Sequence, residues 1–218
     1  MTDRPVLFSA PMIRALLEGR KTMTRRILKP QPDIPNGAEI ELLGVEGNPR
    51  PHITINCLIT SQVLRWSVGD RLWVREAGAT ISYPTGHDPI MAKDIWSVIG
   101  WKHTADGVIL SRKDPITDDI EAYIGDCSFT SRPSIHMPRW ASRLTLTVTN
   151  VRIERVQDIS EADALSEAIE TTGFWREEHP ASICFAALWN SIHGPLAWDR
   201  NDWVSVTSFS VERRNIDA

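Results

Sequence analysis

The sequence predicts an α+β protein, in which a small β-barrel or strongly curved sheet is decorated by helices and interrupted by long inserted loops. The clearest strand signals, at residues 142–156 and 202–213, alternate apolar and polar side chains as half-buried strands do. The helical segments are too few for the regular strand–helix alternation of a doubly wound sheet. An apolar content of 42% with 24% charged residues is ordinary for a globular chain and argues against wholesale disorder.

The N-terminal segment predicts a short strand, "PVLFS", and then a helix over "SAPMIRALLEG". In this helix Ile13 and Leu16 fall on one face, Ser9 can cap the first free amides, and Gly19 ends it. The basic stretch of the chain therefore begins at a helix C-terminus.

Two long segments are predicted to lie outside the main sheet. Residues 31–62 carry several prolines and glycines and are expected to form a loop or an inserted lobe. Residues 77–137 are rich in Gly, Pro and Asp, with one strand-like piece at "DIWSVIGWKHT". Between them, "VGDRLWVREAG" predicts a turn and a strand. We therefore expect one domain over residues 1–218, with insertions at 31–62 and 77–137.

The C-terminal part is predicted to contain a strand, two helices and a closing strand. The first helix opens with a capping box from Ser160 to Asp163, and the second is ended by Gly194 and Pro195. The four elements are, in chain order, "SRLTLTVTNVRIERV", "ISEADALSEAIE", "ASICFAALWNSIHGP" and "DWVSVTSFSVER".

Charge and cysteine content exclude several classes of protein. A formal net charge of −4 provides no global field for nucleic acid, so any anion site has to be local. The 3 cysteines are far apart and the 6 histidines form no ligand-spaced cluster with them, so we expect no metal site and no cofactor. The N-terminus lacks the pattern of a secretory signal, and no stretch reaches the length of a membrane span. These features predict a soluble, cytoplasmic protein without a membrane partner.

The stretch "GRKTMTRR" is the densest basic segment. It places Gly19, Lys21 and Arg26 in a G-x-K-x-x-x-x-R pattern, with Thr24 between the lysine and the arginine. Lysine supplies a movable point charge, arginine a planar fork, and threonine a hydroxyl that can donate, accept or attack. This combination suits a pocket for an anionic or carbonyl-rich ligand. The alternative is a solvated basic loop that complements the negative end of the preceding helix dipole.

These residues, placed after an N-terminal helix, resemble the signature of the ASCH domain family. The segments "VGDRLWVRE", "DISEADALSEAI" and "WVSVTSFSV" are also similar to the family pattern. The chain most resembles a larger, phage-associated branch, whose members carry "MPRWASR". The resemblance implies a small β-barrel related to the PUA fold, and it does not extend to the two insertions.

The resemblance also implies an activity. A small bacterial ASCH member is an amidohydrolase that removes the acetyl group from N4-acetylcytidine with a Lys, a Thr and a Glu. Here these positions fall on Lys21, Thr24 and Glu167, while Arg26 falls on a basic position suited to an anion or a base. The implied partner is a nucleoside or modified base, with no cofactor. Other members are proposed to bind or cut RNA, so the family does not fix one chemistry.

From the residues alone, Glu167 is not a catalytic candidate. On a helical projection Leu165, Ala168 and Ile169 form the apolar side and Glu167 lies away from it, which predicts a solvated surface carboxylate. Only the resemblance points to this residue.

Glu76 is the alternative acid or base. It continues the face of Leu72 and Val74 on the predicted strand, so it can be an inward carboxylate. The competing interpretation makes it a strand-end partner for Arg71 or Arg75.

The segment "SIHMPRWASR" brings His136, Arg139, Trp140 and Arg143 close together, a basic and aromatic mixture that can stack a base and hold a phosphate. The alternative is a loop that leads into a strand, with Trp140 covering the end of the barrel. We include Arg139 and Trp140 among the predicted substrate-binding residues, with Gly19, Arg26 and Glu76.

The sequence therefore favours a hydrolase that removes an acyl group from a modified nucleobase or nucleoside. A non-catalytic module that binds RNA or a modified base remains the alternative, and a ribonuclease is a weaker one. The negative net charge counts against binding of long nucleic acid, because phosphate contacts need a basic surface.

Overall fold

The structure is a computed structural model that describes residues 3–34, 38, 40–45, 48–55, 58–88, 93–111, 127–169 and 179–218. Over these residues the fold is α+β, mostly strands with three α-helices, which confirms the predicted class. None of the helices in these ranges is long and apolar enough to cross a membrane.

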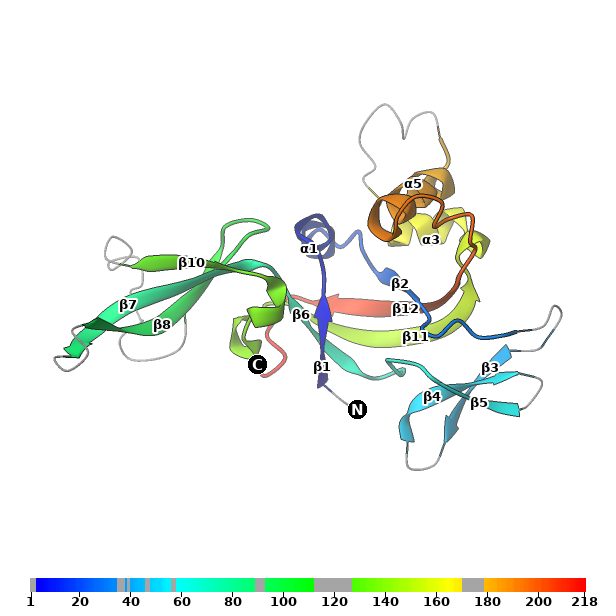
Figure 1. Ribbon diagram of the computed structural model, residues 1–218, viewed down its shortest axis with the longest axis horizontal. Coiled ribbons are helices and arrows are strands. Elements are labelled where there is room, and N and C mark those ends of the chain that lie inside the picture. The colour runs from blue at the N-terminus through cyan, green and yellow to red at the C-terminus, as the bar shows by residue number, and fades with distance from the viewer. Residues whose placement is uncertain are drawn as a thin grey trace. The chain divides into compact units, whose positions relative to one another are not determined.

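The largest sheet has five strands in the order β1-β6-β11-β12-β2 (Figure 1). This order has two ends, β1 and β2, so within the described residues the sheet is open and the expected closure into a barrel is not seen. Closure would require the two end strands to pair with each other. The strands are β1 (Asp3–Leu7), β6 (Arg71–Arg75), β11 (Thr145–Arg155), β12 (Trp203–Glu212) and β2 (Met23–Ile27).

Both predicted insertions form sheets of their own. The first holds a three-stranded sheet, β3-β4-β5, where the sequence predicts a loop or lobe. The second holds a four-stranded sheet, β10-β7-β8-β9, where the sequence predicts one strand-like piece, now β8. The strands are β3 (Ile40–Val45), β4 (Asn48–Ile55), β5 (Leu58–Val63), β7 (Gly78–Asp88), β8 (Lys93–His103), β9 (Ile109–Ser111) and β10 (Ser128–Arg132).

Helices α1 and α5 begin and end close to the predicted residues, whereas α3 ends at Ser166, before the end of the predicted segment "ISEADALSEAIE". Helix α1 (Ala10–Leu17) starts after Ser9, and Gly19 follows it with a φ of +76°. Helix α3 (Glu161–Ser166) is capped by Ser160, whose hydroxyl accepts a hydrogen bond from the Asp163 amide at 3.1 Å. Helix α5 (Ala181–His193) ends at Gly194, which has a φ of +98°. Short 3₁₀ turns are η2 (Ser134–His136), η3 (Arg139–Ala141) and η4 (Val156–Asp158).

The contacts divide the chain into two compact units. The first unit comprises the described parts of Glu18–Arg71 and Leu146–Val211, and the second those of Asp3–Leu17, Leu72–Thr145 and Glu212–Ala218. Each unit has its own core and its own cluster of charged side chains.

The core of the first unit lies between strands β2 and β12 and helices α3 and α5, which lie together in Figure 1. Met23 and Val206 from the strands pack with Phe185 and Trp189 of α5 and with Ala164 of α3. A neighbouring cluster joins the three-stranded sheet to β11 and contains Leu28, Ile53, Leu64, Val151 and Ile153. The helices thus cover one face of β2 and β12.

The core of the second unit surrounds Trp101, which is fully buried with Met137 and Ala141. Gly78 is required beside it, because a Cβ there would lie 2.4 Å from Trp101 Nε1 and 2.5 Å from the Lys102 carbonyl oxygen. This close approach sets the start of β7 directly against β8.

Candidate functional site

The pairing of β2 with β12 decides which side chains of the basic stretch face the helices. The two strands are antiparallel, with Arg25 opposite Val206, Thr24 opposite Thr207, and Arg26 opposite Ser205. Because successive side chains point to opposite faces of a strand, Arg25 lies on the helix-covered face, while Thr24 and Arg26 share the other face.

Lys21, just before β2, is fully buried and forms an ion pair with Glu167, a residue 146 positions further along the chain. Its Nζ donates to the Glu167 carboxylate Oε2 at 2.8 Å and to the Glu167 carbonyl oxygen at 3.0 Å. The Thr22 amide donates to the Ser166 carbonyl at 3.0 Å, which fixes the two segments side by side. The structure therefore brings together two of the three residues that the resemblance points to.

The expectation from the helical projection, that Glu167 is a solvated surface carboxylate, is wrong: the residue is 7% exposed. Helix α3 ends at Ser166, and Glu167 is its C-cap. The following Ala168 has a φ of +61°, so the chain turns and the helical projection does not apply beyond Ser166. The carboxylate is thereby directed to Lys21 and Arg25.

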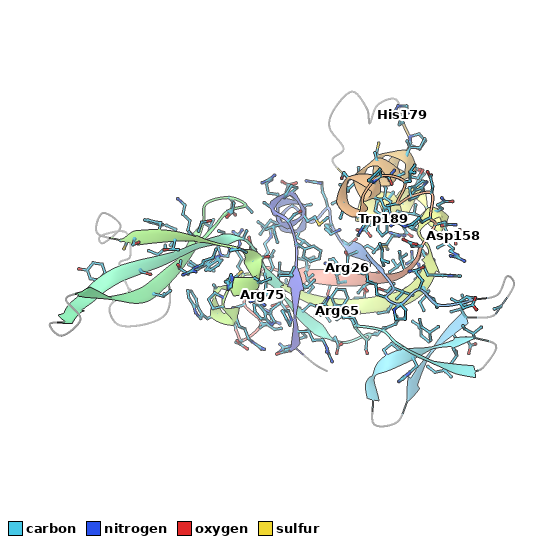
Figure 2. The ribbon with its side chains drawn as sticks, viewed as in Figure 1. Arg26, Arg65, Arg75, Asp158, His179 and Trp189 are labelled. Atoms are coloured by element: carbon cyan, nitrogen blue, oxygen red, sulfur yellow. The ribbon has the colours of Figure 1, made fainter. Side chains whose placement is uncertain are left out.

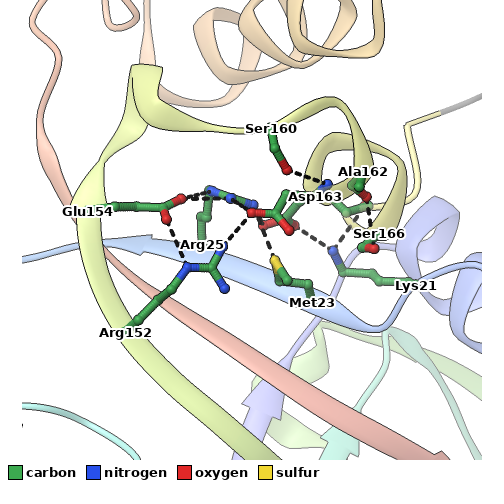
Figure 3. Close-up of polar contacts among 10 residues, drawn as sticks. Lys21, Met23, Arg25, Arg152, Glu154, Ser160, Ala162, Asp163 and Ser166 are labelled. Atoms are coloured by element: carbon green, nitrogen blue, oxygen red, sulfur yellow. Dashed lines mark hydrogen bonds and ion pairs between the residues drawn. The ribbon is translucent and has the colours of Figure 1, made fainter.

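Arg25 connects three carboxylates from different elements, and Figure 3 shows its contacts. It donates to Glu154 at 2.7 Å and 3.1 Å, to Asp163 at 2.9 Å, and to Glu167 at 3.3 Å. Arg152 completes the set with bonds to Glu154, at 2.8 Å, and to Asp163. We call these six residues the ion-pair network: Lys21, Arg25, Arg152, Glu154, Asp163 and Glu167.

In the ion-pair network three cations face three carboxylates, so its charges balance on the helix-covered side of β2. The sequence analysis did not select Arg25, Glu154 or Asp163. A signal was present, because Arg152 and Glu154 are two apart on a strand and so point to the same face.

Thr24 is 6% exposed and lies two residues before Arg26 on the other face of β2. A cavity of about 440 Å³ opens next to Arg26, within the first unit. Two of the residues that line it, Arg26 and Arg65, are labelled in Figure 2. We call this the basic cavity; its lining residues are Arg26, Ile27, Leu28, Lys29, Arg65, Trp66, His193 and Ser205.

The pKa of Arg26 is affected by its burial and by a neighbouring cation of the basic cavity. Burial, and then the charge of Arg65, lower the pKa of the Arg26 guanidinium below its ordinary value, while Glu167 acts in the opposite direction. Sequence reasoning selected Arg26 but missed Lys29, Arg65 and His193. The adjacent basic and aromatic residues Arg65 and Trp66 were the available signal.

Glu76 is an inward carboxylate, 1% exposed, and it belongs to the second unit. Arg143, rather than Arg71 or Arg75, forms a two-pronged bond to it, with both N–O distances at 2.9 Å. His103 Nδ1 lies 3.2 Å from the same carboxylate, and Arg143 also binds Asp106 at 2.6 Å. We call Glu76, His103, Asp106 and Arg143 the Glu76 cluster.

The pKa of Glu76 reflects this cluster. Burial alone would raise the pKa, but the hydrogen bonds from His103 and Arg143 outweigh it, so the pKa lies below its ordinary value. Glu76 is therefore held as a carboxylate between cationic and imidazole partners.

Arg139, Trp140 and Gly19 occupy other positions. Arg139 binds Asp217, with distances down to 2.6 Å, and Asp3 at 2.6 Å, and these bonds raise its pKa above the ordinary value. Trp140 packs on the Trp101 core, in agreement with the interpretation of a loop that leads into a strand. Gly19 provides the left-handed turn after α1, and a Cβ there would meet nothing within 4 Å.

Among the described side chains, His, Cys, Asp and Glu form no group of three or more that could hold a metal ion. No protein-family model matches the chain, and neither a curated protein nor a solved structure matches it.

Proposed function

We propose that this protein is an amidohydrolase of the ASCH type, with a PUA-like core, which removes an acyl group from a nucleobase or nucleoside such as N4-acetylcytidine. The observation that carries the proposal is the fully buried Lys21–Glu167 ion pair, with Nζ and Oε2 2.8 Å apart, inside the basic motif. Paired, buried ionisable groups of this kind occur at sites that transfer protons.

In the proposed scheme the ion pair receives the proton of Thr24. Lys21 precedes β2, whereas Thr24 lies on the strand face away from the ion-pair network, so the transfer needs a bridging water. Lys21 donates to two oxygens of Glu167, so it can take a proton from Thr24 only when it passes one of its own to the carboxylate. Thr24 needs such an acceptor, because a neutral hydroxyl attacks an amide poorly. In this scheme Glu167 stores the proton that Thr24 releases.

The bonds balance in two steps. Thr24 Oγ forms a bond to the acyl carbon, the bond from that carbon to the exocyclic nitrogen breaks, and the nitrogen takes the proton from Glu167. Water then attacks the acyl carbon of the Thr24 ester, and the bond from that carbon to Oγ breaks. One proton of the water passes through the same pair to Thr24 Oγ, and a carboxylic acid leaves. Arg26, two positions after Thr24 on the same face of β2, binds an anionic or carbonyl oxygen of the substrate.

The test is incubation of the purified protein with a panel of N-acylated nucleosides, followed by mass spectrometry of the products. We expect loss of the acyl group, and we expect Thr24→Ser to retain part of the activity that Thr24→Ala loses. A transient mass increase on the Thr24 peptide, equal to the acyl group, would identify the ester. Turnover that Thr24→Ala slows only modestly, without such an adduct, would limit Thr24 to positioning the amide.

A non-catalytic module that binds RNA or a modified base is the second candidate. It is favoured by the balanced charges and deep burial of the ion-pair network, which are also typical of a structural tie between a strand and a helix. Tight binding of N4-acetylcytidine without release of acetate would support this candidate and exclude the hydrolase.

A further inference from the structure

We propose that the basic cavity holds a phosphate group, so that the preferred substrate is a phosphorylated nucleoside, a nucleotide, rather than a free nucleoside. The identity of the acylated base rests on the proposed function, whereas the phosphate site rests on the cavity itself. A volume of about 440 Å³ is in the range of small-molecule sites.

The lining of the basic cavity has one sign of charge. Arg26, Lys29 and Arg65 contribute cations, and among the described residues that line the cavity none is a carboxylate. Two guanidinium groups and an ammonium group can donate hydrogen bonds to the oxygens of a phosphate. Because the three cations repel one another, a bound anion would also be favourable electrostatically.

Two lining residues restrict the geometry further. The guanidinium carbon of Arg65 lies 5.3 Å from the centre of the Trp66 ring, which holds this cation against a rigid aromatic wall. Trp66 is 2% exposed, and its indole nitrogen is buried without a hydrogen-bond partner among the described residues. Trp66 therefore contributes a fixed wall to the cavity, while the charge comes from Arg65.

His193 also responds to the charge around the cavity. Burial, and then the charge of Arg200, lower its pKa below the ordinary value, and Lys29 and Arg26 act in the same direction. Asp202 opposes them. A bound phosphate would reverse this balance, so its arrival should raise the pKa of His193.

The position of the cavity relative to Thr24 fits a nucleotide. Thr24 and Arg26 share a face of β2 and are separated by two residues, about 7 Å along a strand. The ribose and ring of one nucleotide can span the distance between a phosphate at Arg26 and an acyl group at Thr24.

The first experiment measures binding by calorimetry, with inorganic phosphate, cytidine 5′-monophosphate and cytidine as probes. We expect the two phosphate probes to bind and cytidine to bind more weakly. Arg65→Gln, and independently Lys29→Gln, should weaken phosphate binding roughly tenfold or more, as loss of a charged hydrogen bond does. Both side chains are exposed on the cavity rim, so the variants should fold, which circular dichroism checks.

Arg214→Gln is the matched control: it removes the same charge from an exposed arginine that pairs with Glu212 and does not line the cavity. If the control weakens phosphate binding as much as Arg65→Gln, or if phosphate does not bind, the proposal is wrong. The titration of His193 by NMR, assigned with His193→Gln, gives a second readout. A pKa that stays unchanged on addition of phosphate would also overturn the proposal.

The second experiment separates this inference from the proposed function. We expect N4-acetylcytidine 5′-monophosphate to be hydrolysed with a lower KM than N4-acetylcytidine, and Arg65→Gln to remove this difference. Equal KM values for both would overturn the phosphate site and leave the hydrolase standing. Arg65-dependent phosphate binding without any hydrolysis would support the phosphate site and contradict the hydrolase.

Discussion

Two buried glutamates, Glu167 and Glu76, distinguish the roles that a carboxylate can have in this chain. Glu167 contacts the Lys21 ammonium and lies 7% exposed in the first unit. Glu76 is held by Arg143 and His103 in the second unit.

We predict that Glu167→Gln lowers kcat for an acylated nucleoside by roughly a hundredfold or more, because the group that holds the proton is lost. Glu76→Gln is the matched control and should keep most of kcat. A silent Glu167→Gln beside an inactive Glu76→Gln would assign the acid to Glu76.

A second prediction at this scale concerns stability. Lys21→Met should lower the free energy of unfolding by about 3 kcal/mol, because it removes the ammonium that contacts the buried Glu167 carboxylate at 2.8 Å and leaves the longer contact with Arg25, at 3.3 Å. The neighbouring Arg20 is exposed and pairs with Glu18, so Arg20→Met should change stability by about 0.5 kcal/mol or less. Urea unfolding of both variants measures the difference. Equal small losses would show that Lys21 contributes little to folding.

The residues of the site differ in how far the sequence predicts them. Lys21, Thr24 and Arg26 lie in one short segment, so their proximity follows from spacing alone. Glu167 required the resemblance, because its helical projection pointed to solvent and the early end of α3 reversed that direction. Arg25 was not selected, since its three carboxylate partners are 129 to 142 residues away and only the fold brings them together.

At the scale of elements, helix α5 depends on α3 for its N-terminal cap. Its own N-cap residue, Pro180, provides no side-chain hydrogen bond. Instead, Glu161 of α3 accepts from the Ala181 amide at 2.6 Å and from the Ser182 amide at 3.1 Å. A carboxylate at this end of a helix pairs with free N–H groups and with the positive end of the dipole.

We predict that Glu161→Ala lowers the free energy of unfolding by about 1 kcal/mol, the usual effect of losing a helix cap. Glu18→Ala is the control, because this carboxylate pairs with the exposed Arg20 and caps no helix. Urea unfolding compares the two variants with the wild type. If Glu18→Ala costs as much as Glu161→Ala, the cap is not the source of the effect.

The elements were predicted well where their periodicity is regular and poorly where it is broken. Strands β6, β11 and β12 lie where the sequence predicts strands, and helices α1 and α5 end at the predicted glycines. The pairing of β7 with β8 shifts register twice, at Ile81/Ser82 and at Pro84/Gly86. At each shift the alternation of side chains between the two faces of the sheet is interrupted, so the sequence lacks the regular period of two that indicates a strand. Prolines and glycines therefore indicated loops in segments where the structure has paired strands.

At the scale of the whole molecule, each unit contains a buried set of paired charges, and the stability of the protein should depend on pH through them. Both described carboxylates with a lowered pKa, Glu76 and Asp106, bind Arg143 in the Glu76 cluster. For Asp106, burial alone would raise the pKa, and the bonds from Arg143 and the Val108 amide outweigh it. Both groups therefore bind protons more weakly in the folded state than in the unfolded chain.

The sign of the pH effect follows from this difference. A carboxylate with a lowered folded pKa stabilises the protein fully above its unfolded pKa, and the contribution is lost as the pH falls through the folded pKa. We predict that the free energy of unfolding falls as the pH drops below the ordinary glutamate value of 4.5. Urea unfolding at a series of pH values from neutral to acidic measures this loss.

Glu76→Gln supplies the decisive comparison for the pH prediction. The variant should be less stable at neutral pH by about 3 kcal/mol, because Arg143 and His103 lose a buried partner. It should also lose less stability on acidification than the wild type, since one of the two titrating groups is gone. The ion pairs of Arg139 with Asp217 and Asp3 should contribute less to stability than those of Glu76, because they lie at an exposed site where solvent screens the charges. Parallel pH curves for the wild type and Glu76→Gln would mean that Glu76 is not the source of the acid sensitivity.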